Sequence, residues 1–263
     1  MINDFFSKRT VVLAHRGDSK RFPENTMPAF ISAWEMGVDV IETDIHLSAD
    51  GRVIIWHDPD LSRITGLRGK IEDFTWDELS KVDAGANFSR DGGRTFPFRG
   101  KGIKMVLFRE VLRELPEARF NVDLKDENPD LVDKFASILE EEKAVNRVIG
   151  ASFHHKILKL LRKRLPSLIT SFSSKEVKII LLQKILRLLR FRRKYPGQVL
   201  QVPERSGKLA VVDPLLLKTV HKAGLKVQVW TVNEAPDMKR LLSMGIDGIF
   251  TDDPLLLLRE FKA

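Results

Sequence analysis

Short strand-like runs alternate with helix-like segments, and this rhythm constrains the fold more than any other feature of the sequence. The runs are rich in β-branched residues and lie near 11–15, 39–45, 119–125, 147–153, 167–172, 198–202, 226–232 and 247–252. Helical patterns lie between most of them, at about 27–36, 105–114, 130–143, 155–164, 175–192, 213–223 and 235–244. Eight strands with intervening helices in 263 residues predict a (β/α)8 TIM barrel. The main alternative is an open doubly wound sheet, and we favour the barrel because no glycine-rich dinucleotide loop follows the first strand.

One segment departs from this parallel rhythm. Asp50-Gly51 separates the strand pattern of 39–45 from that of 53–57, and Asp-Gly in this position is typical of a tight hairpin. Because a parallel pair needs a long crossover, residues 53–57 are predicted to pair antiparallel with strand 39–45 as an extra strand. Residues from about 60 to 103 then form an insertion, and the whole chain, 1–263, is expected to be a single barrel domain.

Composition excludes several classes of protein. Hydrophobic residues make up 43% of the chain, which is enough for a sizeable core and excludes a mainly disordered protein. The chain has no cysteine, so disulfides, thiolate metal sites and cysteine nucleophiles are excluded. No apolar run approaches the length that spans a bilayer, and the first residues lack a secretory pattern. We therefore expect a cytoplasmic protein.

Positive charge is concentrated in one segment. The net charge is +8, and residues 175–194 hold eight Lys and Arg residues against Glu176 alone, a local charge of +7. The rest of the chain is near neutral, so no nucleic-acid partner is expected. The segment predicts an amphipathic helix that contacts an anionic membrane surface, and the alternative is an ordinary outer helix of the barrel.

Charged residues gather near the ends of two predicted strands. Glu42 and Asp44 are two residues apart, as are Asp123 and Lys125, so each pair lies on one face of its strand. Barrel active sites are built at the carboxyl ends of the strands. One such pair alone would indicate charges that face solvent on the outside of the barrel. Two pairs at equivalent strand positions indicate an active site.

The three carboxylates of Glu42, Asp44 and Asp123 suit a hard divalent cation. Oxygen ligands without a thiolate favour Mg²⁺ or Ca²⁺ over zinc, and the spacings common to zinc hydrolases are absent. The sequence therefore predicts a Mg²⁺ or Ca²⁺ cofactor.

Two histidines and two cations complete the predicted site. His15 ends the first strand and His57 ends the hairpin strand, and imidazoles beside carboxylates are a natural acid and base pair. We assign His15 as the base and His57 as the acid. Arg16 and Lys125 are placed to grip an anion such as phosphate. His46 shares the parity of Glu42 but lies toward the hairpin turn, so we leave it out of the site.

These residues belong to motifs that occur together in one enzyme family, and their order along the chain is the family's order. The motifs are His15-Arg16-Gly17, Pro23-Glu24-Asn25-Thr26, Glu42-Thr43-Asp44-Ile45-His46-Leu47, Asp50-Gly51, His57-Asp58, Asn121-Val122-Asp123-Leu124-Lys125, Ser152-Phe153, Val229-Trp230-Thr231-Val232-Asn233 and Gly245-Ile246-Asp247-Gly248-Ile249-Phe250-Thr251-Asp252. The chain thus resembles the glycerophosphodiester phosphodiesterases. Each motif is weak alone, but jointly they are highly specific.

The resemblance implies metal-dependent hydrolysis of a glycerophosphodiester to glycerol 3-phosphate and an alcohol, by a barrel with an insertion after the hairpin strand. By matching motif, the resemblance implies that Glu42, Asp44 and Asp123 are the metal ligands. It implies that His15 and His57 are the acid and base pair. It also implies that Arg16 and Lys125 contact the phosphate and that Trp230 forms a wall of the site.

Two positions depart from the family pattern. Asp123 stands where the family usually has glutamate, and its carboxylate reaches one methylene less far. Met105-Val106-Leu107-Phe108 replaces a common Ile-Pro-Thr-Leu in a loop that borders the mouth.

Two alternatives for the function remain at this point. The nearest keeps the same site but acts as a lysophospholipase D on lysophospholipids at a membrane surface. The other is a peripheral membrane-binding module without chemistry. The sequence also leaves open whether water or a neighbouring glycerol hydroxyl attacks the phosphorus.

Overall fold

The computed structural model describes residue 5 and residues 10–186, 195–207 and 209–261. Eight parallel strands form the barrel, in the order β7-β6-β5-β2-β1-β12-β11-β8, and a bridge between Ser171 and Val199 joins the two ends of this order. The strands are β1 (Val11–Ala14), β2 (Val40–Leu47), β5 (Phe120–Leu124), β6 (Val148–Ala151), β7 (Ile169–Thr170), β8 (Val199–Pro203), β11 (Lys226–Trp230) and β12 (Gly248–Thr251). The predicted (β/α)8 barrel is therefore confirmed.

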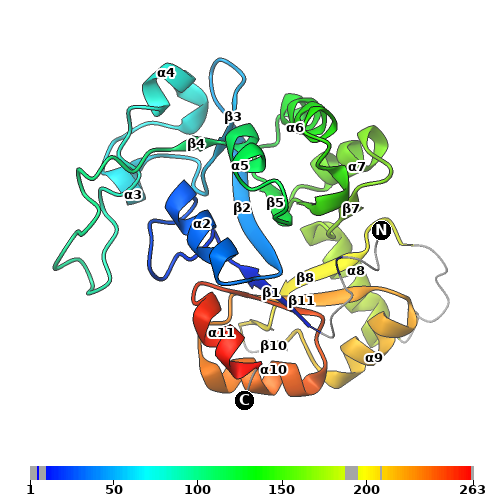
Figure 1. Ribbon diagram of the computed structural model, residues 1–263. Helices are drawn as coiled ribbons and strands as arrows, with labels where there is room; N and C mark the ends of the chain where they lie inside the picture. Colours follow the sequence, from blue (N-terminus) through cyan, green and yellow to red (C-terminus); the bar gives the residue numbers. More distant parts are fainter. Residues whose placement is uncertain (1–4, 6–9, 187–194, 208, 262–263) are drawn as a thin grey trace.

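Helices surround the strands (Figure 1). They are α2 (Met27–Glu35), α5 (Phe108–Glu114), α6 (Pro129–Glu141), α7 (His155–Arg164), α8 (Ser174–Ile185), α9 (Pro214–Lys222), α10 (Ala235–Met244) and α11 (Pro254–Glu260). The sequence did not predict α11. The predicted helix 175–192 is observed as α8 up to Ile185, and residues 187–192 lie outside the described part of the chain.

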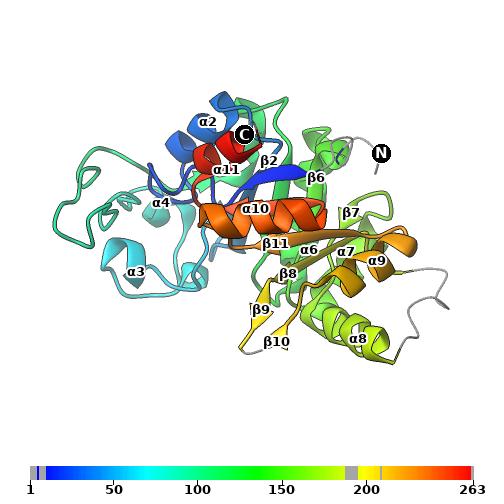
Figure 2. The same cartoon turned by 90° about the horizontal axis from the view of Figure 1, so that it is seen from below.

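The predicted hairpin is confirmed. Strand β3 (Val53–Ile55) pairs antiparallel with β2, and a short strand that was not predicted, β4 (Val106–Leu107), pairs with β3. The insertion between β3 and β4 holds α3 (Ser62–Thr65), a 3-10 turn at Ile71–Asp73 and α4 (Trp76–Leu79). The insertion contributes most of a small apolar cluster that also includes Trp56. Figures 1 and 2 both show the insertion and α8 on opposite sides of the barrel, with a two-stranded hairpin of β9 (Arg205–Ser206) and β10 (Leu209–Ala210) near α8.

Strand parity decides which side chains enter the barrel. Val11, Leu13, Val40 and Phe250 belong to one buried cluster, separate from the larger core that includes the apolar faces of the helices. Side chains alternate along a strand, so a residue two or four positions after one of these four residues also points into the barrel. Such residues lie at the carboxyl ends of the strands. This parity positions the site described next. Among the described residues, no helix is both long and apolar enough to cross a bilayer.

Candidate active site

A pocket at the carboxyl ends of the strands brings together all the residues that the sequence singled out. Its lining includes His15, Arg16, Glu42, Asp44, His57, Asp123, Lys125 and Trp230. These residues come from the ends of four barrel strands, β1, β2, β5 and β11, and from the segment after β3. Their position is as expected, and their roles remain predictions.

The carboxylates are neighbours because of strand register. Asp44 lies beside Asp123, and Glu42 beside Asn121, in the parallel pairing of β2 with β5. Glu42, Asp44 and Asp123 are buried, with 5%, 1% and 6% of their surface exposed. The alternative of solvated charges on an outer edge is therefore excluded.

Lys125 lies between two of these acids. Its Nζ is 2.8 Å from Asp44 Oδ1 and 2.7 Å from Asp123 Oδ2. Asn25 Nδ2 donates to the other oxygen of Asp44 at 2.9 Å. Burial alone would raise the pKa of Asp44, but the charges of Lys125 and Arg16 outweigh it and lower that pKa to about 2. Asp44 is thus an ionised carboxylate with both oxygens engaged.

Glu42 and Asp123 are less well neutralised. Glu42 Oε2 accepts a hydrogen bond from the Arg16 backbone N–H at 2.9 Å. Burial, and then the charge of Asp44, raise the pKa of Glu42 to about 7. Asp123 Oδ1 is buried and has no hydrogen-bond partner among the described residues. The pocket therefore holds more negative charge than its own cations balance.

This donor set fits a divalent cation in kind. All three side chains offer carboxylate oxygens, and Asp123 Oδ1 is buried without a hydrogen-bond partner among the described residues, as is Arg16 Nε. In the described part of the chain, no three His, Asp or Glu side chains are already arranged as a set of metal ligands. Lys125 lies between Asp44 and Asp123 instead.

A carboxylate at the end of β12 orients His15. The imidazole Nδ1 lies 2.6 Å from Asp252 Oδ1, and Asp252 also accepts from Asn233 Nδ2 at 2.7 Å. His15 Nε2 lies 3.9 Å from Glu42 Oε2. Burial would lower the pKa of His15, but Glu42 and Asp252 outweigh it and raise that pKa.

A chain of ion pairs that runs through the insertion orients His57. The imidazole Nδ1 lies 2.7 Å from Asp58 Oδ1, and Arg63 Nε of α3 donates to Asp58 Oδ2 at 2.5 Å. Arg63 also binds Glu24 through both terminal nitrogens, at 2.6 and 2.9 Å, and Glu24 accepts from Arg16 Nη1 at 2.8 Å. The insertion thus links His57 to Arg16 through Asp58, Arg63 and Glu24.

The two histidines differ in the direction of their pKa shifts. Burial lowers the pKa of His57, and Arg16 and Lys125 add to that effect against the charge of Asp44. The pKa of His15 is raised. The assignment of His15 as base and His57 as acid stays a prediction.

His46 supports the site from outside, in agreement with its exclusion. Its Nδ1 lies 2.5 Å from Asp126 Oδ1, and its Nε2 lies 3.2 Å from the backbone carbonyl oxygen of His57.

Sequence reasoning gave no role to five side chains that hold the site in place. They are Glu24, Asn25, Asp58, Arg63 and Asp252. Four of them belong to the motifs noted in the sequence, and that position was a usable signal. Arg63 lies in the insertion, where no sequence pattern pointed to it.

Aromatic side chains border the pocket mouth. Trp230 and Phe153 meet edge to face, with ring centroids 5.8 Å apart at 82°. Lys125 Nζ lies 5.8 Å from the centre of the Phe153 ring, and Phe153 is 51% exposed. One side of the mouth is thus apolar and accessible, beside the charged floor.

The chain matches the model of the Glycerophosphoryl diester phosphodiesterase family over residues 15–256. It is 32% identical over 255 residues to a "Glycerophosphodiester phosphodiesterase" of Caldanaerobacter subterraneus subsp. tengcongensis, covering 95% of this chain and 97% of that relative. It is 28% identical over 277 residues to human "Lysophospholipase D GDPD1", covering 98% and 86% of the two chains.

Solved structures share the fold. A phosphodiesterase of Oleispira antarctica, solved "in complex with the product sn-glycerol-3-phosphate", superposes with a TM-score of 0.82 at 22% identity. The match covers 98% of this chain and 99% of that one.

The position of Lys125 predicts a coupling between charge and stability. Lys125→Met leaves Asp44 and Asp123 buried side by side without the ammonium between them, so we expect the free energy of unfolding to fall by about 1–3 kcal/mol. The double variant Lys125→Met/Asp123→Asn removes the stranded charge as well, and we expect a coupling of at least about 0.5 kcal/mol. Urea denaturation in the presence of a chelator measures both quantities. Additive losses in the double variant would contradict the observed bridge.

Proposed function

The chain belongs to the glycerophosphoryl diester phosphodiesterase family and is a phosphoric diester hydrolase. From that premise we propose that it hydrolyses a glycerophosphodiester to glycerol 3-phosphate and an alcohol with the help of a divalent metal ion. One observation carries the proposal: two carboxylate-oriented histidines, three buried carboxylates and two cations line the same pocket.

Arg16 and Lys125 are the proposed contacts for the phosphodiester. Both side chains are 16–18% exposed, so their charges act in a partly dehydrated pocket, where electrostatic interactions are stronger than in water. Glu24 fixes the guanidinium of Arg16, and Asp44 and Asp123 fix the ammonium of Lys125. Both cations are held in place before the substrate arrives.

Glu42, Asp44 and Asp123 are the proposed ligands of Mg²⁺ or Ca²⁺. Such an ion supplies positive charge that stabilises the extra negative charge on the phosphoryl group in the transition state. The carboxylates carry the charge to hold it, and the unpartnered Oδ1 of Asp123 and the raised pKa of Glu42 support the proposal.

His15 and His57 are the proposed acid and base. Asp252 and Asp58 engage the Nδ1 atoms, and this leaves each Nε2 to exchange a proton with the substrate. One histidine accepts a proton from the attacking oxygen, and as the phosphorus–oxygen bond to the alcohol breaks, the other gives a proton to the leaving oxygen. If water attacks, glycerol 3-phosphate forms directly. If a glycerol hydroxyl attacks, a cyclic phosphate forms first, and water then opens the ring with breakage of the bond from phosphorus to that hydroxyl oxygen.

A lysophospholipid is the second candidate substrate. Trp230 and the half-exposed Phe153 place an apolar wall beside the phosphate contacts. Such a wall suits the apolar acyl chain of a lysophospholipid better than the hydroxyl of a glycerophosphodiester. The human relative named above carries the name of a lysophospholipase D. A binding module without chemistry gives no reason for this set of polar groups, and family membership argues against it. We retain the cytoplasm, with association at a membrane surface, as the predicted location.

Side-by-side turnover of two substrates tests the proposed function. With Mg²⁺ or Ca²⁺ present, we expect glycerophosphocholine to yield glycerol 3-phosphate and choline, because the phosphate contacts need no acyl chain. Lysophosphatidylcholine would yield lysophosphatidic acid and choline, and phosphorus NMR distinguishes the products. Turnover of the lysophospholipid alone would support the second candidate, and turnover of neither would contradict both.

Removal of divalent metal is expected to abolish turnover. The reason is that three buried carboxylates face only two cations in the pocket. A chelator should stop the reaction, add-back of Mg²⁺ or Ca²⁺ should restore it, and the ion should also raise the melting temperature of the wild type more than that of Asp44→Asn. Full activity in excess chelator, in a protein shown by elemental analysis to hold no metal, would overturn the metal proposal.

His15→Ala and His57→Ala should each lower kcat by roughly 10²–10⁴, the range for loss of a general acid or base. His221→Ala is the matched control, because His221 is also paired with a carboxylate, Asp247 at 2.6 Å, but lies on α9 outside the pocket lining. We expect its kcat to stay near that of the wild type. A variant at either pocket histidine that keeps normal kcat would remove that residue from the proposed mechanism.

A further inference from the structure

Helix α8 carries a stripe of large apolar side chains that the barrel does not cover. Ile179, Leu182, Ile185 and Leu186 are 40%, 55%, 72% and 55% exposed. Positions three and four apart fall on one face of a helix, so these side chains form one continuous strip. Soluble surfaces do carry single exposed apolar residues, but a strip of four along one helix indicates a binding surface.

The strip is exposed although α8 is firmly attached to the barrel. Glu176 in its first turn is buried and accepts two hydrogen bonds from Arg162 of α7, at 2.7 and 3.1 Å. Ser173 caps the helix and exchanges hydrogen bonds with Glu176, and Ile180 is buried on the inner side. Ile180 and Glu176 are the buried residues of the helix, so it packs on the barrel through a narrow inner side.

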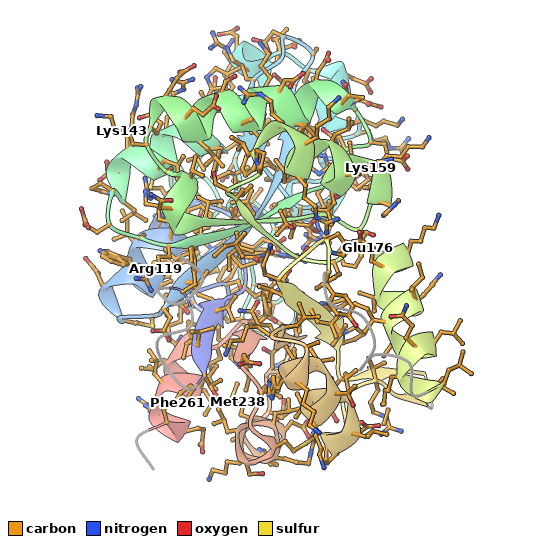
Figure 3. The ribbon with its side chains drawn as sticks, turned by 90° about the vertical axis from the view of Figure 1, so that its right-hand side faces the viewer. Arg119, Lys143, Lys159, Glu176, Met238 and Phe261 are labelled. Atoms are coloured by element: carbon orange, nitrogen blue, oxygen red, sulfur yellow. The ribbon has the colours of Figure 1, made fainter. Side chains whose placement is uncertain are left out.

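The surroundings of the strip are basic. Glu176 is the one acidic residue in α7 and α8 as the structure describes them, and its charge is already paired with Arg162. Exposed lysines lie on both helices, together with Leu160 of α7, which is 39% exposed. Figure 3 faces this side of the molecule and shows α8 below α7, with Lys159 and Glu176 labelled. The exposed lysines are Lys156, Lys159, Lys163, Lys175 and Lys178.

We propose that this α7–α8 face, made of the five exposed lysines, Leu160 and the α8 strip, docks on an anionic lipid bilayer. Apolar side chains with lysines around them match the boundary between acyl chains and negatively charged headgroups. A second copy of the chain is a poorer partner, because a twofold contact would bring the same lysines of both copies together.

The face adjoins the active-site pocket. Phe153 and Phe172 line the pocket, and they lie just before α7 and α8 along the chain. Both helices therefore start near the mouth and run away from it, and the α8 strip begins at Ile179, more than one turn along its helix. Resting on the proposed function, we expect the docked protein to meet a phospholipid with a single acyl chain that has left the bilayer.

Sedimentation with vesicles tests the docking without any catalysis. The full chain is mixed with vesicles of phosphatidylcholine alone, or of phosphatidylcholine with phosphatidylglycerol, at low and at high salt. We expect binding to the anionic vesicles at low salt, weaker binding at high salt and little binding to the neutral ones. A lysine near an anionic leaflet strengthens binding about fivefold, so the triple change of Lys159, Lys163 and Lys178 to Glu should weaken it by roughly a hundredfold or more.

Matched variants separate local contact from net charge. The control carries the same change of charge in and beside the insertion, on the far side of the barrel, and should bind like the wild type. It is Arg68→Glu/Lys101→Glu/Lys104→Glu, at three exposed positions. Leu182→Ser/Ile185→Ser/Leu186→Ser should weaken binding at least about tenfold, by loss of apolar contact. Leu67→Ser, at a position 51% exposed in the insertion, should not.

Each outcome decides the proposal. Equal loss in both charge-reversal variants would overturn it, as would negligible binding of the wild type to anionic vesicles. A dimer in sedimentation velocity that the α8 changes dissociate, without vesicle binding, would assign the face to a second copy instead. Turnover of water-soluble glycerophosphocholine by the same preparations reports on the proposed function alone, so failure of one proposal is distinguished from failure of the other.

Discussion

Three carboxylates buried at one point of a barrel are the constraint on which the rest of the site depends. Burying a carboxylate without a partner is costly, and register places Asp44 directly beside Asp123, with Glu42 one layer below. Arg16 and Lys125 offset two of the three charges, and Glu24 shares the charge of Arg16. One of the three negative charges is left without a matching cation. Asp123 Oδ1 has no hydrogen-bond partner among the described residues, and the pKa of Glu42 is raised.

The same imbalance bears on substrate binding. A phosphodiester is an anion, and a pocket with a surplus of carboxylates would repel it. The divalent cation that we propose would offset this surplus and leave the pocket able to accept one negative charge. The proposed function therefore predicts that metal binding and substrate binding are linked.

Features of the fold that depend on local sequence patterns could be predicted. The alternation of side chains along a strand placed Glu42, Asp44 and Asp123 inside the barrel correctly, and Asp50-Gly51 predicted the hairpin. Ion pairs that join distant segments leave no such trace: Arg63 lies in the insertion and pairs with Asp58 and Glu24 only in the folded structure. The apolar side chains exposed on α8 agree with the surface helix predicted for 175–194, up to Leu186. The sequence alone could not separate it from an ordinary outer helix, because a hydrophobic pattern shows which side chains avoid water but not what covers them.

The barrel ties the chemistry of the pocket to the surface of its helices. In two places an outer helix begins two or three positions after residues that line the pocket. Ser152 and Phe153 precede α7, and Ser171 and Phe172 precede α8 in this way. The docking face that we propose on α7 and α8 is therefore connected to the pocket through the first turns of these two helices.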